Sequence, residues 1–253
     1  MKTVSQIKNE LSRVRRINSP ILQEWVHDPR KGVQRAVRSR RRQLIRYRNR
    51  RLAFHRRFKY ENRLWQNGHQ LIAGVDEVGR GPLAGPVVTC AMVLPRNFNL
   101  VMTNDSKQLT PRERTILYPQ ILSQAIDYGI GIGSRELIDR INIYEADRLA
   151  MKRAILALSC HVSYIIVDAM QIDVSTPQLK LYHGDEKSVS VAAASIVAKV
   201  YRDHLMDKYD RIYPQYDFKH NAGYGTPKHL AALKKYGVTP IHRRSFAPVR
   251  RML

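Results

Sequence analysis

Residues 72–88 read Ile-Ala-Gly-Val-Asp-Glu-Val-Gly-Arg-Gly-Pro-Leu-Ala-Gly-Pro-Val-Val. An apolar run ends here in two adjacent carboxylates, Asp76 and Glu77, directly before a glycine-rich turn. Two neighbouring anions repel each other and resist desolvation, so a strand that ends in such a pair needs a cation shared between them. The stretch therefore predicts a site of chemistry, with a metal ion or a strong basic partner beside the carboxylates.

The composition of the chain predicts a polyanionic partner. Its 253 residues suffice for one large domain or for a domain with an extension, and 43% hydrophobic residues are compatible with a packed core. The formal net charge of +23 is extreme for a soluble enzyme. The commonest physical reason for such a charge is binding to nucleic acid, with a basic surface that serves only solubility as the alternative.

The positive charge is concentrated near the N-terminus. Residues 30–59 contain 14 Lys and Arg and no Asp or Glu. Residues 1–70 contain 20 basic and 4 acidic residues, a net charge of +16, which leaves +7 for the other 183 residues. Such a segment is typical of a nucleic-acid-binding module. We therefore expect a basic helical extension over residues 1–67, whose candidate contacts to the nucleic-acid backbone are Arg38, Arg41, Arg42 and Arg46.

Helix start signals divide this extension. Thr3 and Gln6 have the spacing of a capping box, Ser19-Pro20 restarts a short helix, and Asp28-Pro29 precedes a long basic one. The pattern predicts three helices in about the first 65 residues. Like charges at i,i+4 weaken the long helix in isolation, so we expect it to be fully ordered only against a polyanion or the main domain. An organellar transit peptide is the alternative for such an Arg-rich N-terminus.

The remaining sequence signals indicate a cytoplasmic protein. No apolar stretch is long enough to span a bilayer, and the N-terminus lacks the hydrophobic core of a secretory signal. Cys90 and Cys160 are far apart and lack the spacing of metal ligands. We expect both cysteines to be reduced, small hydrophobic residues in a reducing compartment.

After Gly68 the pattern changes to an α/β alternation. Amphipathic runs predict helices at about residues 110–126, 136–158, 188–213 and 228–236, and β-branched runs predict strands at residues 71–76, 86–94, 128–134, 163–168 and 178–182. The glycines of residues 129–133 do not match the dinucleotide-binding fingerprint, so we interpret them as strand glycines.

Two further acidic residues stand at positions that can lie close to Asp76 and Glu77 in the fold. Asp168 ends the fourth predicted strand, and Asp185 lies in a loop before the long helix. Because the carboxyl ends of neighbouring strands meet in one crevice, the four acids can line a single site. Carboxylate oxygens suit Mg²⁺ or Mn²⁺, and in a nucleic-acid-binding chain they indicate two-metal phosphodiester hydrolysis. Taken singly, Asp168 could equally be a helix cap and Asp185 a turn residue.

An ordered set of motifs between about Leu71 and Val249 resembles bacterial ribonuclease HII. One motif would be weak support, whereas the same order across the whole region is very specific. The matching stretches are Gly74-Val-Asp-Glu-Val-Gly-Arg-Gly-Pro-Leu-Ala-Gly-Pro86, Asp105-Ser-Lys-Gln-Leu109, Ile166-Val-Asp168, Ala193-Ala-Ser-Ile-Val-Ala-Lys199 with Arg202-Asp203, Gly223-Tyr-Gly-Thr226 and His242-Arg-Arg-Ser-Phe246.

The resemblance implies a fold and an activity. The fold is a mixed central sheet of the RNase H type flanked by helices, here over residues 68–253. The activity is endonucleolytic cleavage of the RNA in RNA–DNA hybrids and cleavage 5′ to ribonucleotides embedded in duplex DNA. The products would carry 5′-phosphate and 3′-hydroxyl ends, and the process would serve ribonucleotide removal during DNA replication and repair.

The resemblance also implies residue roles. Asp76, Glu77 and Asp168 match the metal ligands, and Asp185 matches a further catalytic acid. The turn Gly79-Arg80-Gly81 matches the segment that meets the ribose 2′-hydroxyl, and Ser106 and Lys107 match a substrate-contacting pair. Tyr224 matches a tyrosine that packs against the sugar at the RNA-to-DNA junction, although a core tyrosine beside a turn is the ordinary alternative.

The chemistry of the turn supports its implied role. Glycine removes the side chain where a backbone touches a sugar, and the 2′-hydroxyl is the group that distinguishes RNA from DNA at one nucleotide.

One position departs from the family pattern. Many relatives have His-Lys before Gly-Tyr, whereas this chain has His220-Asn-Ala-Gly223, which removes a cation near the substrate. The Arg-rich extension could compensate for that loss. His183, His204 and His229 have no spacing that requires a role, so we treat them as structural or surface residues.

We therefore expect a monomeric ribonuclease that depends on Mg²⁺ or Mn²⁺ and acts on RNA–DNA hybrids and ribonucleotide-containing duplex DNA. Two other classes stay open at this point. A non-enzymatic nucleic-acid binder explains the charge but not the acids, which repel phosphate unless metals intervene. A DNA nuclease such as a junction resolvase explains both, but it has no need of a turn suited to sensing a 2′-hydroxyl.

Overall fold

The computed structural model describes residues 2–253 and divides them into two compact units. The first unit extends to His55, and the second comprises Arg56–Leu253. This division falls inside a helix, twelve residues before the expected boundary after residue 67. Each unit has its own hydrophobic core, so each is described separately below.

The first unit is a small helical module. Its helices are α1 (Val4–Arg13), α2 (Pro20–Glu24) and most of α3 (Lys31–Arg57). The predicted capping box is present, because the Thr3 hydroxyl accepts a hydrogen bond from the backbone N–H of Gln6 and the Gln6 side chain accepts one from Thr3. Apolar residues of α1 pack with residues of α3 in a core that contains Ile7, Leu11, Val14, Leu22, Val33, Val37 and Leu44.

The N-terminal region contains four helices instead of the three expected. The long helix ends at Arg57, and α4 (Lys59–Gln66) follows after Phe58, which is buried. In α4 the buried carboxylate of Glu61 accepts hydrogen bonds from the Ser188 hydroxyl, at 2.5 Å, and from the backbone N–H of Ser190, at 3.1 Å. These long-range contacts tie α4 to the start of α9 (Val189–Ile212) within the second unit, and no periodicity along the sequence could have shown them.

The sheet of the second unit has five strands in the order β3-β2-β1-β4-β5. Strands β1 and β2 and strands β2 and β3 pair antiparallel, whereas β4 pairs parallel with both β1 and β5. This mixed sheet confirms the predicted fold class. The strands are β1 (Ile72–Val78), β2 (Val87–Val93), β3 (Asp127–Gly133), β4 (Tyr164–Asp168) and β5 (Gln178–Leu181).

The register of the central strands brings the predicted acids together. Val75 lies opposite Val167 in the parallel pair of β1 and β4, so the residues that follow each of them, Asp76 and Asp168, occupy the same end of adjacent strands. Strand β1 continues past Asp76 to Val78 instead of ending there as expected.

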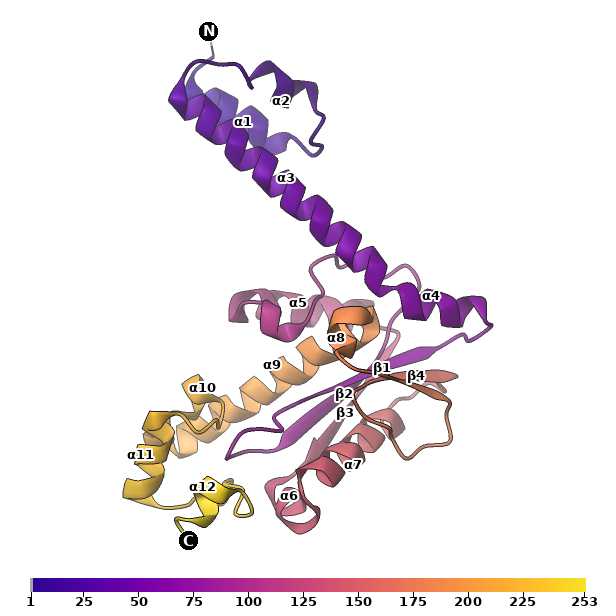
Figure 1. Cartoon of the computed structure of the whole chain (residues 1–253), viewed down its shortest axis with the longest axis vertical. Coiled ribbons are helices and arrows are strands. Elements are labelled where there is room, and N and C mark those ends of the chain that lie inside the picture. The colour runs from indigo at the N-terminus through magenta and orange to yellow at the C-terminus, as the bar shows by residue number, and fades with distance from the viewer. Residues whose placement is uncertain (1) are drawn as a thin grey trace. The chain divides into compact units, whose positions relative to one another are not determined.

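Helices cover both faces of this sheet (Figure 1). Helix α9 (Val189–Ile212) packs on one face with α5 (Pro111–Gln124), and α7 (Ile143–Leu156) packs on the other. The backbone of α7 approaches β3 so closely that a Cβ on Gly131 would lie 1.9 Å from the Ala150 carbonyl oxygen. The predicted strand glycines are therefore required by helix packing.

The helix expected at residues 136–158 is two helices. Helix α6 (Arg135–Ile141) ends at Asn142, which has a φ of 70° and whose side chain accepts a hydrogen bond from the Glu145 backbone N–H. Asn142 therefore ends one helix and caps the next, because asparagine tolerates the left-handed region and serves as an N-cap.

The C-terminal part of the second unit has a smaller core of its own, which the sequence did not predict. Short elements surround it, namely η2 (Pro214–Tyr216), α10 (Phe218–Asn221), α11 (Pro227–Tyr236) and α12 (Ala247–Arg250), whereas the short elements η1 (Ser106–Gln108) and α8 (Gly184–Lys187) lie outside it. Its buried residues are Leu83, Ala84, Met206, Tyr216, Phe218, Ala232, Leu233 and Val249. This core connects the turn after β1 to the last 40 residues of the chain.

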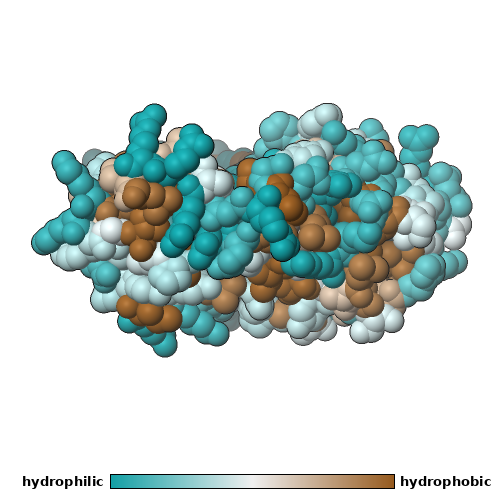
Figure 2. Space-filling model, turned by 90° about the horizontal axis from the view of Figure 1, so that it is seen from below, coloured by the Kyte–Doolittle hydropathy of each residue, from teal (hydrophilic) through white to brown (hydrophobic). Residues whose placement is uncertain are grey.

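The surface is predominantly polar on the face seen in Figure 2, where hydrophobic residues gather in separate patches among hydrophilic ones. Within residues 2–253, no helix has the length and apolar character needed to cross a membrane.

Candidate active site

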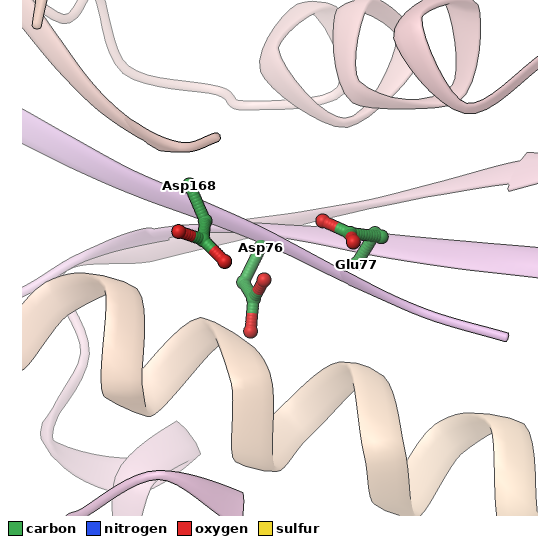
Figure 3. A group of neighbouring side chains, drawn as sticks. All are labelled: Asp76, Glu77 and Asp168. Carbon is green, nitrogen blue, oxygen red and sulfur yellow. The ribbon is translucent and has the colours of Figure 1, made fainter. Parts of the chain in front are cut away.

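Three predicted acids form one cluster at the ends of β1 and β4. Asp76, Glu77 and Asp168 each offer a carboxylate oxygen, and these oxygens lie within 4.8 Å of one another. Figure 3 shows the carboxylates of Asp76 and Asp168 converging, with the Glu77 carboxylate turned toward them. Such a group of oxygen ligands suits a hard divalent cation.

Neighbouring groups orient two of these carboxylates. The backbone N–H of Gly184 donates a 2.7 Å hydrogen bond to Oδ1 of Asp168. Asp76 points toward α9, where the Ser195 hydroxyl hydrogen-bonds to it. The Ser195 hydroxyl also lies 2.9 Å from that of Ser106, so a short polar chain connects η1 to the acid cluster.

The electrostatics of the cluster favour a bound cation. Burial raises the pKa of Asp76 well above its ordinary value, and the negative charges of Glu77 and Asp168 raise it further. Burial and the neighbouring charge of Asp147 raise the pKa of Glu77 to about 8. Carboxylates that resist ionisation because they are buried together become stable anions when a cation lies between them. The residues present therefore fit a divalent metal ion.

Asp185 lies beside the cluster and not within the group of three. It belongs to the short helix α8 instead of the expected loop, and it is buried. Burial and the neighbouring Asp105 raise the pKa of Asp185 to about 6. Its Oδ2 lies 3.9 Å from Nζ of Lys107, whose side chain is otherwise exposed to solvent.

The predicted Ser106 and Lys107 therefore lie next to these acids, but they differ in exposure. Ser106 is buried against Ser195, whereas Lys107 is free to reach outward from η1. Asp105 begins η1 by accepting a hydrogen bond from the Lys107 backbone N–H at 2.8 Å. Sequence reasoning missed Asp105, although it stands in the same motif as the two predicted residues.

The Gly79-Arg80-Gly81 turn is held by two buried arginines, Arg202 and Arg243. Neither guanidinium has exposed surface, and both donate to backbone carbonyls. Arg243 donates to the carbonyl oxygens of Gly79, Arg80 and Gly85, at 2.5, 2.7 and 2.9 Å.

Arg202 reaches the same segment from α9. It donates to the carbonyl oxygens of Ala84, Pro86 and Ala222. Gly79 has a φ of 99°, and a Cβ at this position would lie 2.2 Å from Nε of Arg202, so only glycine fits here. The turn is therefore a rigid element of the site.

The side chain of Arg80 connects the metal cluster to a buried acid that the sequence did not single out. Nη1 of Arg80 lies 3.8 Å from Oε1 of Glu77, and Nε lies 3.4 Å from Oδ2 of Asp147 in α7. Asp147 has no exposed surface, and within residues 2–253 neither of its carboxylate oxygens has a hydrogen-bond partner. Burial raises the pKa of Asp147 to about 7, against the opposing charge of Arg80.

Tyr224 lies against the turn at the protein surface. About half of Tyr224 is exposed (49%), and a Cβ on Gly81 would lie 3.3 Å from Cε1 of its ring. Gly81 has no side chain, so the Tyr224 ring can pack directly on its backbone while about half of the tyrosine stays exposed. The structure thus places three predicted substrate-binding residues, Arg80, Gly81 and Tyr224, near one another.

The remaining predicted residues lie elsewhere. Arg38, Arg41, Arg42 and Arg46 are exposed on α3 in the first unit, where Arg42 and Arg46 line a surface hollow with Ser39 and Ile45. His220, in the departure from the family pattern, lies 2.5 Å from the carboxylate of Asp217. Sequence reasoning missed Asp147, Ser195, Arg202 and Arg243, of which all but Asp147 stand in motifs that it quoted without assigning a role.

Comparisons with protein families match almost the entire chain. The model of "Ribonuclease HII" matches residues 73–249, and that of "Ribonuclease HII N-terminal domain" matches residues 3–65. Ribonuclease HII from Lactobacillus gasseri is 55% identical over 247 residues, which cover 98% of each chain.

Solved structures support the same fold. The ribonuclease H2 of Pyrococcus horikoshii OT3 superposes with a TM-score of 0.63 at 28% identity, over 72% of this chain and 97% of that chain. Bst-RNase HIII in complex with Mn²⁺ superposes with a TM-score of 0.57 at 18% identity, over 72% of this chain and 68% of that chain. At that identity the second likeness concerns the fold alone.

Proposed function

The chain belongs to the ribonuclease HII family and is a ribonuclease H, and from this premise we propose that it cleaves the RNA of RNA–DNA hybrids and cuts 5′ to ribonucleotides embedded in duplex DNA. The products carry 5′-phosphate and 3′-hydroxyl ends. The reaction removes ribonucleotides during DNA replication and repair, and the enzyme acts as a monomer in the cytoplasm.

The proposed metal site consists of Asp76, Glu77 and Asp168, with Asp185 as a further catalytic acid. Bound Mg²⁺ or Mn²⁺ ions would activate water and stabilise the charge on the phosphate and on the leaving 3′ oxygen. The chain's own contribution is to orient the ligands. Gly184 and Ser195 hold the carboxylates of Asp168 and Asp76, and burial keeps bulk water away from Asp76.

The turn provides the proposed selectivity for a ribonucleotide. Gly79 and Gly81 let the backbone approach the ribose 2′-hydroxyl, which is absent from DNA. Arg80, whose side chain is 40% exposed, is placed to contact a phosphate while it stays close to Glu77. The ring of Tyr224 packs on the sugar at the RNA-to-DNA junction, and Ser106 and Lys107 complete the substrate contacts.

The extension over residues 1–67 supplies affinity without sequence recognition. Arg38, Arg41, Arg42 and Arg46 are exposed on α3, and contacts from such side chains to phosphates hold nucleic acid without reading its bases. The catalytic domain over residues 68–253 then selects the cleavage position.

One observation carries this proposal. Three carboxylates whose oxygens lie within 4.8 Å of one another occupy the adjacent ends of β1 and β4, and β1 leads directly into a rigid glycine turn lined by Tyr224. A non-enzymatic binder has no use for the acids, and a junction resolvase has no use for the turn.

The test compares three substrates in the presence of Mg²⁺. These are a DNA duplex with one ribonucleotide, the same duplex made of DNA only, and a four-way DNA junction. We expect cleavage only of the first, 5′ to the ribonucleotide. Asp76→Asn should abolish cleavage while binding, measured by fluorescence anisotropy, is retained. Equal cleavage of all three substrates would refute the proposal.

A further inference from the structure

Two buried histidines outside the proposed catalytic and substrate-binding residues contact each other directly. His229 in α11 and His242 in the following loop have no exposed surface, and their Nε2 atoms lie 2.9 Å apart. The rings of Tyr216 and Phe218 surround them, with centroids between 5.1 and 6.0 Å from those of the histidines. An apolar environment of this kind disfavours the charged form of either histidine.

The hydrogen bonds indicate which ring nitrogens carry the protons. Nδ1 of His242 lies 3.0 Å from the backbone nitrogen of Thr239 and 2.7 Å from the Thr239 hydroxyl. A backbone N–H can only donate, so Nδ1 is an acceptor and the proton of the neutral ring is on Nε2. Nδ1 of His229 lies 2.9 Å from the carbonyl oxygen of Tyr224, which can only accept, so His229 carries its proton on Nδ1.

One direction of donation follows from these assignments. Nε2–H of His242 donates to Nε2 of His229, and Nδ1–H of His229 donates to the Tyr224 carbonyl. Burial lowers the pKa of His229, and burial with the neighbouring His229 lowers the pKa of His242 to about 4, so both rings are neutral at physiological pH. Neither histidine therefore has to gain or lose a proton for these hydrogen bonds to form.

The series of hydrogen bonds ends at the Tyr224 carbonyl and so fixes the backbone that carries the Tyr224 ring. The Tyr224 carbonyl also accepts from the Thr226 backbone N–H at 2.8 Å, and the Tyr224 N–H donates to Asn221 at 2.9 Å. On the other side, the backbone N–H of Leu83 donates to the Gly223 carbonyl at 2.8 Å. The exposed ring of Tyr224 is thus attached to a segment whose backbone N–H and carbonyl groups are hydrogen-bonded.

Arg243, the residue after His242, holds the Gly79-Arg80-Gly81 turn of the proposed substrate site. Arg243 donates to the carbonyl oxygens of Gly79 and Arg80, and its own backbone N–H donates to the Leu83 carbonyl at 2.8 Å. His242 also forms a β-bridge with Ala84. His242 therefore connects to Tyr224 through His229, and the next residue, Arg243, connects to the Gly79-Arg80-Gly81 turn. Tyr224 and this turn are the two elements that we propose to flank the ribonucleotide.

We propose that His229 and His242 are positioning residues that fix Tyr224 relative to the Gly79-Arg80-Gly81 turn and thereby set the preference for a single embedded ribonucleotide. This inference rests on the proposed function, because it takes Tyr224 as a substrate contact. The histidines touch no substrate themselves and act only through the Tyr224 backbone.

Two substitutions of one residue separate the hydrogen bond from the packing. In His242→Asn the side-chain oxygen can still accept from Thr239 near the position of Nδ1, but no donor reaches His229. In His242→Gln the amide nitrogen can occupy the position of Nε2 and donate to His229, although the acceptor for Thr239 is lost. The Gln variant is therefore the rescue control for the Asn variant.

We expect His242→Asn to raise KM about ten-fold for a duplex with one ribonucleotide, the size expected for one lost buried hydrogen bond, with kcat nearly unchanged. His242→Gln should retain most of the wild-type KM, and a long RNA–DNA hybrid should be affected less than the single ribonucleotide. In a Tyr224→Ala background, His242→Asn should have no further effect on KM, because the group that it positions is gone.

Three results would overturn the inference in distinguishable ways. If His242→Asn raised KM equally in the Tyr224→Ala background, the histidines would stabilise the fold and not position Tyr224. If Tyr224→Ala alone left KM unchanged, the proposed role of Tyr224 would fail, and the positioning role would fail with it. Independently of activity, ¹⁵N NMR of the full-length protein should show the Nδ1–H tautomer for His229 and the Nε2–H tautomer for His242, and the reverse pattern would disprove the chain of hydrogen bonds.

Discussion

Nε of Arg80 lies 3.4 Å from Oδ2 of Asp147, a carboxylate with no exposed surface and no hydrogen-bond partner within residues 2–253. Within residues 2–253, the positive charge of Arg80 and, to a smaller extent, that of Arg243 lower its pKa. Arg80 therefore compensates a buried anion beside Glu77, in addition to the contact with substrate phosphate that we propose for it.

Removing Arg80 should destabilise the fold in a pH-dependent way. Arg80→Leu leaves Asp147 without its closest counter-charge, and above the raised pKa of about 7 we expect the free energy of unfolding to fall by about 2 kcal/mol. At pH 6 the loss should be smaller, because a protonated Asp147 needs no counter-charge. Urea unfolding at pH 6 and pH 8.5 measures both values. In an Asp147→Asn background the loss should disappear, and an undiminished loss there would contradict this account.

Glu61 should contribute to stability although it lies outside the predicted catalytic domain. Its carboxylate accepts two hydrogen bonds from side chains, Ser188 and Ser190, and one from the Ser190 backbone N–H. Glu61→Ala leaves these buried donors unsatisfied, and we expect a loss of about 2 kcal/mol or more in the free energy of unfolding of the second unit. The control is Glu10→Ala, which removes a surface ion pair with Lys2 and should cost less than about 1 kcal/mol. Equal losses would show that Glu61 does not tie α4 to the domain.

The exposed arginines of α3 should determine the salt dependence of binding and not the cleavage position. Replacing Arg38, Arg41, Arg42 and Arg46 by Gln removes up to four phosphate contacts. The slope of log K against log salt for a ribonucleotide-containing duplex should then become shallower by about 3 to 4. Anisotropy titrations over a range of salt concentrations measure this slope. Cleavage mapped on a sequencing gel should stay at the same phosphate, and a shifted cut would show that the extension helps to select the site.

Metal affinity should increase with pH. Burial raises the pKa of Asp76 well above its ordinary value and that of Glu77 to about 8, so at lower pH these carboxyl groups carry protons that a metal ion has to displace. Calorimetric titration with Mn²⁺ should therefore give tighter binding at pH 8 than at pH 6, with more protons released at pH 6. The variant Glu77→Gln should release fewer protons. The same affinity at both pH values would mean that these carboxylates do not bind the metal.

Local patterns were sufficient to predict an α/β domain and the acid cluster, whereas the mixed sheet of the RNase H type was implied by the family resemblance. The β-branched runs that end in Asp76 and Asp168 predicted two strands whose carboxyl ends meet, and the parallel pairing of β1 with β4 confirms that arrangement. The capping box at Thr3 was likewise predictable, because every atom in it lies within three residues along the chain.

The supporting residues were not predictable, because their roles depend on contacts between distant segments. Arg243 donates to carbonyl oxygens more than 150 residues earlier in the chain, and Asp147 meets Arg80 only because α7 packs beneath the sheet. No period or spacing indicates such a contact. A basic residue that becomes fully buried has the same sequence signature as one on the surface, so Arg202 and Arg243 could not be distinguished from the many solvated arginines of this chain.

We propose that this site cleaves nucleic acid at a ribonucleotide because the turn beside Asp76 and Glu77 senses a 2′-hydroxyl. The most direct test measures single-turnover cleavage in Mg²⁺ of two duplexes that differ only by the 2′ oxygen of one nucleotide. We predict rapid cleavage 5′ to the ribonucleotide and no detectable cleavage of the deoxy duplex, with both duplexes bound at similar affinity. Comparable cleavage rates for the two duplexes would contradict the claim.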